Sequence, residues 1–414
     1  MNKNSSSKLW LLGSLYISQY LPVSFFYQTL PTFMRQQGAS LEAIGAVGFL
    51  ILPWTLKFLW SPLIDRFSLN RARHYSSWIW LFQILLAISV AICGLLDLRQ
   101  NFPLLMGFTL LACFFSASQD IATDALSVGI LQKSERVWGS TIQSAGNYLG
   151  GVIGGGGVMI LLDRIGWRSS MLMMAGFILI AGLPILRHRE RQLVKPEVKP
   201  SLTPFIGFFK RDGMMFWVVL LLIYLAGTSM ASSMMKPLLV DLKFTLTEIG
   251  QIVGIVSYSA GIVGALMGGV IISKWGIDRS LVWFGIFQGV SVLACLPLAR
   301  GATSIAIVYV VNISLQLFSS MAYTAVCTVM LEKSELATAG TDYTIQTSLI
   351  YLGSILAMVG AGSIAERLGY EWMLSIAMGL CGLSVIVAQR WSINEREFDR
   401  LQPVMMPKIN FDDR

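Results

Sequence analysis

The sequence has little charge. Of its 414 residues only 13% are Asp, Glu, Lys or Arg and 55% are hydrophobic, whereas soluble domains carry roughly 25% charged residues. The mean hydropathy is +0.65. A soluble core of this size cannot bury so much apolar surface, so the composition indicates that lipid is the solvent. The formal net charge of +8 is typical of basic cytoplasmic loops in a membrane protein and does not indicate nucleic-acid binding.

The sequence is also poor in groups for catalysis and metal binding. Its two histidines, His74 and His188, lie in basic stretches. Its five cysteines lie in apolar runs without a CxxC pair or a nearby histidine, so we predict small core residues rather than disulfides or a zinc site. The motifs H-E-x-x-H and G-x-S-x-G and a P-loop lysine are absent. We therefore predict a protein that is not an enzyme and that holds no cofactor and no metal ion.

What the sequence does contain is a series of long apolar runs. A helix needs about 20 apolar residues to cross a bilayer, and we expect twelve such spans, bent at Pro22 and Pro53. Of the 31 lysines and arginines, 22 lie in the tails and even-numbered connections, 8 lie on the opposite side, and Lys57 lies inside a span. The positive-inside rule therefore places both termini in the cytoplasm. The expected spans are 9–30, 41–61, 78–96, 103–131, 137–162, 169–187, 213–236, 246–273, 281–299, 303–331, 337–365 and 373–390.

The two parts of the chain are copies of each other. A cytoplasmic linker, 188–212, separates an N-terminal six-helix bundle, 1–187, from a C-terminal one, 213–390, and a tail without expected structure, 391–414, follows. Motifs recur at a shift of 200 residues and then of 203. An even number of spans in each copy predicts a parallel repeat, which is an architecture of alternating-access transport. The repeated motifs are LQKSE (131–135) and LEKSE (331–335), TIQ (141–143 and 344–346), YLG (148–150 and 351–353), and DRIGW (163–167) and ERLGY (366–370).

The connection after the second expected span reads SPLIDR (61–66), and the second copy reads GVIISKWG (269–276). With these motifs and its repeat, the chain resembles the major facilitator superfamily over essentially its whole length. The resemblance implies an all-α integral membrane protein with twelve transmembrane helices in two six-helix parallel-repeat halves. It also implies that Asp65, Arg66 and Lys274 gate the cytoplasmic side. We expect Asp65 to meet helix N-termini of its own half and Arg66 to pair with a nearby carboxylate.

Two further stretches, KFLWSPLIDR (57–66) and SASQDIATDA (116–125), look like the AmpG-like branch of that superfamily. This branch contains muropeptide permeases, which usually carry two more spans, and shorter RhtX/FptX-type siderophore permeases. The resemblance therefore implies proton-coupled uptake of an iron–siderophore complex across a bacterial inner membrane, by a chain that works as a monomer. The alternatives are uptake of a muropeptide or another amphipathic solute, drug/proton antiport, which the glycines of the fifth span suit, and a non-transporting membrane sensor.

Two carboxylates interrupt the apolar fourth span. Asp120 and Asp124 share one helical face, and Asp120 lies roughly 26 Å along the helix at 1.5 Å per residue. A charge facing lipid costs at least ~2.5 kcal/mol, so both acids should face a partner, and Lys57 lies at a similar depth. One lysine facing two aspartates leaves one acid able to take up a proton, and we predict that these three residues couple protons. The second copy has Ser320 and Thr324 instead of the aspartates, which favours coupling over a purely architectural role.

Aromatic and amide side chains inside the spans are candidates for the cargo site. Rings with polar tips suit a planar, partly apolar ligand, although interhelical hydrogen bonds produce the same pattern. Few cations besides Lys57 lie in the spans, which disfavours a strongly polyanionic cargo. The predicted cargo residues are Tyr20, Gln28, Gln119, Asn147, Tyr224, Asn312, Gln316 and Tyr351.

Overall fold

The structure, a computed structural model, describes residues 3–36, 46–70, 72–97, 100–188, 190, 203–211 and 213–405. All regular structure in these ranges is helical. Ten stretches are long and apolar enough to cross a membrane, and the shorter apolar stretch Val47–Leu59 adds another. One of the ten, Lys133–Arg187, is 55 residues long and changes direction at Gly166, so it supplies two spans. The described part of the chain therefore confirms an all-α membrane fold with twelve spans.

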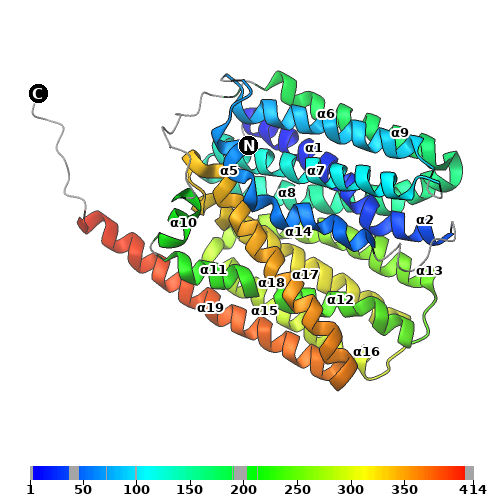
Figure 1. Cartoon of the computed structure of the whole chain (residues 1–414). Helices are drawn as coiled ribbons and strands as arrows, with labels where there is room; N and C mark the ends of the chain where they lie inside the picture. Colours follow the sequence, from blue (N-terminus) through cyan, green and yellow to red (C-terminus); the bar gives the residue numbers. More distant parts are fainter. Residues whose placement is uncertain are drawn as a thin grey trace, which may run out of the picture.

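The helices before the polar linker lie together in the upper part of Figure 1. In chain order they are α1 (Lys3–Ser24), the π-helical turn η1 (Phe25–Thr29), α2 (Leu30–Gln36), the 3₁₀ turn η2 (Ala46–Ile51), α4 (Leu52–Leu56), the 3₁₀ turn η3 (Lys57–Leu59), α5 (Ser61–Arg66), α6 (His74–Leu95), α7 (Phe102–Ile130), the 3₁₀ turn η4 (Lys133–Glu135), α8 (Arg136–Gly151), the π-helical turn η5 (Val152–Gly157) and α9 (Val158–Arg187).

The helices after the linker lie in the lower part of the same view. They are α10 (Thr203–Lys210), α11 (Met214–Ile223), α12 (Ala226–Asp241), α13 (Leu246–Ile249), the π-helical turn η6 (Gly250–Val256), α14 (Ser257–Trp275), α15 (Ile277–Leu293), α16 (Leu296–Ala299), α17 (Ile305–Lys333), the 3₁₀ turn η7 (Leu336–Thr338), α18 (Ala339–Leu368) and α19 (Tyr370–Met405).

Glycine turns the chain at equivalent places of the two copies. Gly166 and Gly369 have φ angles of 75° and 86°, in the left-handed region that glycine adopts without steric cost. A Cβ at either position would meet no atom within 4 Å, so the backbone conformation, not a lack of space, requires glycine. The repeated motifs DRIGW and ERLGY therefore encode the same turn, between spans five and six and between spans eleven and twelve.

The second span is not one regular helix. The 3₁₀ turn η2 leads into α4, where Pro53 occupies the first turn, and η3 then separates α4 from α5, where Pro62 occupies the first turn. Proline is tolerated there because the first N–H groups of a helix have no intrahelical acceptor. Lys57 begins η3, so the predicted bend at Pro53 is part of a longer irregular segment that carries the buried lysine.

Glycines allow α8 and η5 to lie directly against α1. A Cβ on Gly150 would come within 3.0 Å of the Cβ of Tyr20, and one on Gly154 within 2.0 Å of the carbonyl oxygen of Leu21. Small residues that let helix backbones approach closely are a common packing device in membranes. These contacts show that the glycines of the fifth span pack helices together, which requires no role in drug export.

The two groups of helices touch on two sides. On one side α8 packs against α14 and α17, and on the other α18 packs against α5 and α7. Figure 1 shows α18 beginning beside α5 and crossing the lower group toward α16. Every residue of the interior site described below lies on one of these helices or on α1, η1 and the second span.

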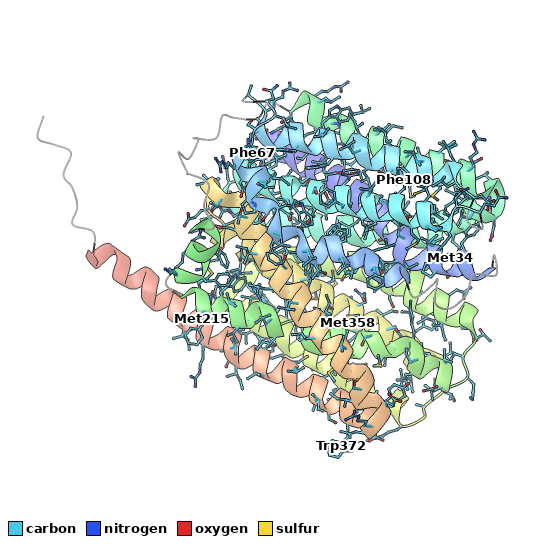
Figure 2. The ribbon with its side chains drawn as sticks, viewed as in Figure 1. Met34, Phe67, Phe108, Met215, Met358 and Trp372 are labelled. Atoms are coloured by element: carbon cyan, nitrogen blue, oxygen red, sulfur yellow. The ribbon has the colours of Figure 1, made fainter. Side chains whose placement is uncertain are left out.

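The outer surface of the helices is apolar, as a lipid-facing surface requires. Met215 and Trp372, which Figure 2 shows at the edge of the lower group, are 65% and 64% exposed. Val359 is 68% exposed. All five cysteines are buried and free, which confirms that they are core residues.

The linker 188–212 contains structure that the sequence did not predict. Besides α10, Glu190 accepts hydrogen bonds from the backbone N–H groups of Tyr75 and Ser76 at 3.1 and 3.0 Å. A carboxylate at this place satisfies the free N–H groups at the start of α6. Residues 191–202 lie outside the described part of the chain.

The tail expected at 391–414 is helical for most of its length, because α19 continues to Met405. Trp391 is 3% exposed, and its ring lies 5.2 Å from that of Trp217. This packing extends the helix beyond the predicted end of the last span. Residues 406–414 lie outside the described part of the chain.

Candidate functional site

The three charged residues predicted inside the spans meet in the interior. Lys57 Nζ forms an ion pair with Asp120 Oδ2, and the two residues are 0% and 2% exposed. Gln19 on α1 donates its amide N–H to Asp120 Oδ1. Both carboxylate oxygens of Asp120 therefore have a partner, and the acid faces protein rather than lipid.

Asp124 lies one turn further along α7 and is fully buried. Its Oδ1 accepts hydrogen bonds from the Tyr16 hydroxyl at 2.9 Å and from Gln143 Nε2 at 3.0 Å. Its Oδ2 is buried and has no hydrogen-bond partner among the described residues. Two carboxyl groups and a single ammonium group, which pairs with Asp120, are thus buried together away from water. In such an arrangement one carboxyl is stabilised by holding a proton.

The second copy lacks all three charges. Its equivalent positions carry Ser320, Thr324 and, when the motif 269–276 is aligned with the SPLIDR motif, Ala265. The two hydroxyls donate to the carbonyls of Gly261 and Ser320, at 2.7 and 3.0 Å. A bundle of the same design therefore packs without the charges, which argues against a purely structural role for them in the first copy.

Aromatic side chains connect Lys57 with the other group of helices. The ammonium nitrogen of Lys57 lies 5.4 Å from the centroid of the Trp54 ring, a cation–π distance. Trp54 lies 5.0 Å from the ring of Tyr20, and the Tyr20 hydroxyl lies 3.2 Å from that of Tyr351 on α18. The predicted residues Tyr20 and Tyr351 are therefore direct neighbours across the interface.

Several other predicted cargo residues carry buried polar atoms without a hydrogen-bond partner in the described part of the chain. Such atoms are rare in folded proteins and mark places where water or a ligand binds. Gln28 also interacts with Tyr258, and Gln316 donates to the Tyr148 hydroxyl at 2.7 Å, both across the interface. The unpartnered atoms are Gln28 Nε2, Gln119 Nε2 and Oε1, and Asn147 Oδ1.

Two predicted cargo residues use their polar groups elsewhere. The Tyr224 hydroxyl donates to the backbone carbonyl of Leu281 at 2.6 Å, which ties the turn after α11 to α15 inside one group of helices. Asn312 donates to the carbonyl of Val308, one turn earlier in its own helix, at 2.8 Å. The structure therefore does not bring either polar group to the interface that holds Lys57.

Trp54 and Tyr343 are residues of the site that the sequence analysis missed. Trp54 could have been found, because it precedes Lys57 by three residues and so lies on the same side of the chain segment. Tyr343 donates to Gln143 Oε1 at 2.6 Å, and Gln143 in turn donates to Asp124. This link crosses between the two groups of helices, and only the three-dimensional arrangement shows it.

Asp65 lies at the end of the molecule where α1 begins, which we call the basal end. It accepts hydrogen bonds from the Gly340 N–H at 3.0 Å and from the Thr341 N–H and hydroxyl at 2.7 and 2.6 Å. Tyr75 adds a fourth bond at 2.9 Å. Gly340 and Thr341 form the first turn of α18, so the carboxylate faces the positive end of that helix.

The position of Asp65 corrects one expectation. We expected it to meet a helix N-terminus of its own half, whereas α18 belongs to the second copy. Asp65 lies beyond the apolar segment Val47–Leu59, and burial raises its pKa above the ordinary value although the bonds from Thr341, Tyr75 and Gly340 act in the opposite direction. The contact therefore joins the two copies instead of bracing one.

The other two predicted gating residues are exposed. The guanidinium of Arg66 lies 5.2 Å from the ring centroid of Phe67, a contact other than the carboxylate pairing that we expected. Lys274 lies at the end of α14 on the surface. A second basal contact comes instead from two hydroxyl groups, Ser140 on α8 and Thr328 on α17, whose oxygens are 2.6 Å apart.

Comparisons with known proteins agree with this architecture. A family model described as Major Facilitator Superfamily matches residues 12–341. Among solved structures, the human organic anion transporter MFSD10 (TETRAN) has a TM-score of 0.77 at 14% identity, over 94% of this chain and all of that chain. At this identity the likeness shows the fold alone.

Proteins related in sequence indicate more than the fold. An uncharacterized protein of Haemophilus influenzae is 32% identical over 282 residues, 66% of each chain. The anhydromuropeptide permease of Escherichia coli K12 is 26% identical over 94% of this chain and 80% of its own length. The putative transporter AmpG 4 of Rickettsia conorii is 23% identical over 94% of this chain and 97% of its own. The chain therefore belongs to the Major Facilitator Superfamily and is a multi-pass membrane transporter with AmpG-like relatives, not an enzyme.

Proposed function

We propose that the protein is a proton-driven permease that imports an anhydromuropeptide-like solute across a bacterial inner membrane. In this proposal both termini are cytoplasmic, the basal end is the cytoplasmic end, and the two copies rock about the interior site to expose it alternately to either side. A single chain is sufficient for this cycle.

The observation that carries the proton coupling is the buried group of Lys57, Asp120 and Asp124. The net charge of the three ionised side chains is negative, and a negative charge away from water is stabilised when a proton binds. A site that loads a proton on one side of the membrane and releases it on the other couples transport to the proton gradient. The loss of all three charges from the second copy supports a role in coupling.

The relatives favour a muropeptide cargo over a ferric siderophore. The expectation of a siderophore rested on length, because muropeptide permeases were expected to carry two more spans. The alignment with AmpG 4 of Rickettsia conorii covers 97% of that protein, so AmpG-named proteins of about this length exist. Length therefore does not separate the two cargo classes, and the permease named for its cargo among the relatives supports the muropeptide.

The polar atoms without partners at the interface suit such a cargo. A muropeptide joins a sugar, which offers hydroxyl groups, to a peptide, which offers amides and carboxylates. We propose that Tyr20, Tyr351, Gln28, Gln119 and Asn147 bind it together with Gln316. Tyr224 and Asn312 stabilise the packing within the second copy through their hydrogen bonds there. At the basal end, the bonds between Asp65 of α5 and the first turn of α18 close the cytoplasmic side. Exposed Arg66 and Lys274 attract anionic solutes or lipid headgroups to this end.

The test is uptake by the purified protein in proteoliposomes with an acidic outside and a neutral inside. We expect labelled anhydro-N-acetylmuramyl tripeptide to accumulate above its external concentration, and a protonophore to abolish accumulation but leave slow equilibration. A double variant, Asp120→Asn with Asp124→Asn, should equilibrate the cargo without accumulating it, whereas Asp163→Asn, at an exposed acid, should behave as the wild type.

Other outcomes would redirect the proposal. Accumulation of a ferric siderophore, with no uptake of the muropeptide, would show that the cargo is wrong. Uptake of the muropeptide that ignores the protonophore would show that the driving force is wrong. Proton-driven extrusion of an added cationic drug by inverted vesicles would favour antiport.

A further inference from the structure

We propose that the cargo is recognised through one carboxylate, which replaces Asp120 at the ammonium group of Lys57 while Asp120 takes up a proton. This inference rests on the proposed function and goes beyond it in naming the chemical group that is bound, the residue that binds it and the acid that carries the coupled proton.

Lys57 is the natural receptor for an anion. Among the described residues it is the one buried cation, at 0% exposure, whereas the other lysines and arginines with known exposure reach the surface. Its ammonium group has one anionic partner, Asp120 Oδ2, and otherwise faces the Trp54 ring. A buried ammonium group must keep a counter-ion, so Asp120 can leave only when another anion arrives.

Hydrogen-bond donors for a second anion are present beside Lys57. Trp54 is 3% exposed, and its indole N–H has no acceptor in the described part of the chain. The Tyr20 and Tyr351 hydroxyls, which bond to each other across the interface, become free when the two groups of helices part. One ammonium and three uncharged donors can hold one carboxylate, which agrees with a cargo that is anionic but not strongly polyanionic.

Asp120, not Asp124, is the acid that exchanges. Asp124 Oδ1 is held by Tyr16 and Gln143, and its unpartnered Oδ2 can carry a proton without breaking either bond. We assign Asp124 as neutral throughout the cycle. Asp120 has its Oδ2 on Lys57 in the structure, so it is the group whose charge must be cancelled when the cargo takes that position.

The charges balance in every closed state. Without cargo, the Lys57 ammonium is paired with the Asp120 carboxylate, and Asp124 is protonated. With cargo, the ammonium is paired with the cargo carboxylate, one proton from the solvent binds Asp120, and Asp124 stays protonated. Release of the cargo on the other side returns the Asp120 carboxylate to Lys57 and frees the proton. One proton therefore accompanies each carboxylate that binds.

The neighbours of Asp120 add no further charge. Besides Lys57 and Asp124, the titratable groups that face it are phenols and a thiol, which are ordinarily neutral at physiological pH. These are Tyr16 and Tyr20 on α1, Tyr323 and Cys327 on α17, and Tyr351 on α18. The exchange therefore depends on the single ammonium group and the two acids.

The test compares labelled anhydro-N-acetylmuramyl tripeptide with the same compound whose carboxylates are converted to carboxamides. We expect the carboxamide to be taken up about a hundredfold more slowly, because it leaves the ammonium group of Lys57 unpaired. Binding of the carboxylate by the wild type should weaken as pH rises. Binding by Asp120→Asn should not depend on pH in this way, and Asp124→Asn should keep the wild-type pH dependence.

A second variant guards against misfolding of Asp120→Asn, which leaves Lys57 without a counter-ion. The neutral pair Lys57→Gln with Asp120→Asn should fold and should no longer distinguish carboxylate from carboxamide. Asp163→Asn serves as the control for losing an acid at the surface. Equal uptake of both cargo forms by the wild type, or a pH dependence lost in Asp124→Asn and kept in Asp120→Asn, would overturn the inference while leaving proton-driven muropeptide uptake intact. No uptake of either form at any pH would instead contradict the proposed function.

Discussion

At the scale of single residues, Lys57 shows how an apolar sequence can contain a charge. A charged side chain in the middle of a membrane costs at least ~2.5 kcal/mol, so it persists only when a counter-ion and hydrogen bonds compensate. Asp120 and the face of Trp54 supply that compensation here. The two acids have different environments, and this difference is the basis for the separate roles that we propose for them.

The first prediction concerns stability. Asp120→Asn should lower the free energy of unfolding by about 3–5 kcal/mol, because it leaves the buried ammonium group of Lys57 unpaired. Adding Lys57→Gln should recover most of that loss, since neither buried charge remains. Asp124→Asn should change little, because Asn can still accept the bonds from Tyr16 and Gln143. Titration with SDS in detergent micelles measures these differences, and equal losses for both Asn variants would contradict the pairing.

The sequence alone predicted that these three charges meet, and the reason is local. Two acids four residues apart share a helix face, and the apolar lengths of the spans fix their depth. The sequence did not predict which of the two acids pairs with Lys57, because Asp120 and Asp124 lie only one helical turn apart on α7. The contacts of Gln143 with Tyr343 and of Tyr20 with Tyr351 depend on how the two copies are placed against each other, and no local pattern encodes that.

At the scale of elements, the two copies repeat one device at the basal end. Lys8, near the start of the first span, pairs with Glu135 of LQKSE at 2.7 Å. Arg211, just before the seventh span, pairs with Glu335 of LEKSE at 3.1 Å. In each copy a cation at the first span thus binds the acid of the connection between the fourth and fifth. The sequence showed the repeated acids, but the cations are lysine in one copy and arginine in the other and lie in dissimilar surroundings.

Element boundaries were harder to predict than the elements themselves. The spans follow from length and hydropathy, which need no tertiary information. The break of the second span around Lys57 and the extension of α19 to Met405 depend on contacts distant in sequence, such as that between Trp391 and Trp217. The predicted partner of Asp65 was wrong for the same reason, since Gly340 at the start of α18 is 275 residues away along the chain.

The contact of Asp65 with α18 leads to a prediction about closure of the basal end. Asp65→Ala removes the acceptor for two N–H groups and a hydroxyl of α18, and loss of a helix cap costs ~0.5–2 kcal/mol. The basal end should therefore open about tenfold more often. A Ser140→Cys reporter, buried in the closed structure, should react faster with a water-soluble maleimide when Asp65→Ala is added.

The matched control for that prediction is Tyr75→Phe, which removes one hydrogen bond to Asp65 from α6 but leaves every bond to α18. It should leave the labelling rate near that of the Ser140→Cys reporter alone. The native cysteines are buried, so the protein without the reporter gives the background. An unchanged labelling rate in Asp65→Ala would show that this contact does not hold the basal end closed.

At the scale of the whole molecule, the links between the two copies lie at different depths. Asp65 with α18 and Ser140 with Thr328 join them at the basal end, and Tyr20 with Tyr351 joins them beside Lys57. The charges that we propose to bind protons therefore lie directly at the surface along which the copies would separate. A change of charge there alters the same interface that must open, so proton binding and opening share one set of contacts.

The last prediction tests whether the copies move as units. Ser140→Cys with Thr328→Cys replaces two oxygens 2.6 Å apart on different copies, and an oxidant should join them because the geometry is close enough for a disulfide. Ser229→Cys with Ser354→Cys replaces two oxygens 3.1 Å apart within the second copy. If the copies rock as rigid bodies, the first cross-link should abolish pH-driven uptake and a reductant should restore it, whereas the second should leave uptake unchanged.

Two results would contradict this expectation. Uptake that survives the first cross-link would show that transport does not need the basal end to open. Loss of uptake by the second cross-link would show that the second copy deforms internally during the cycle.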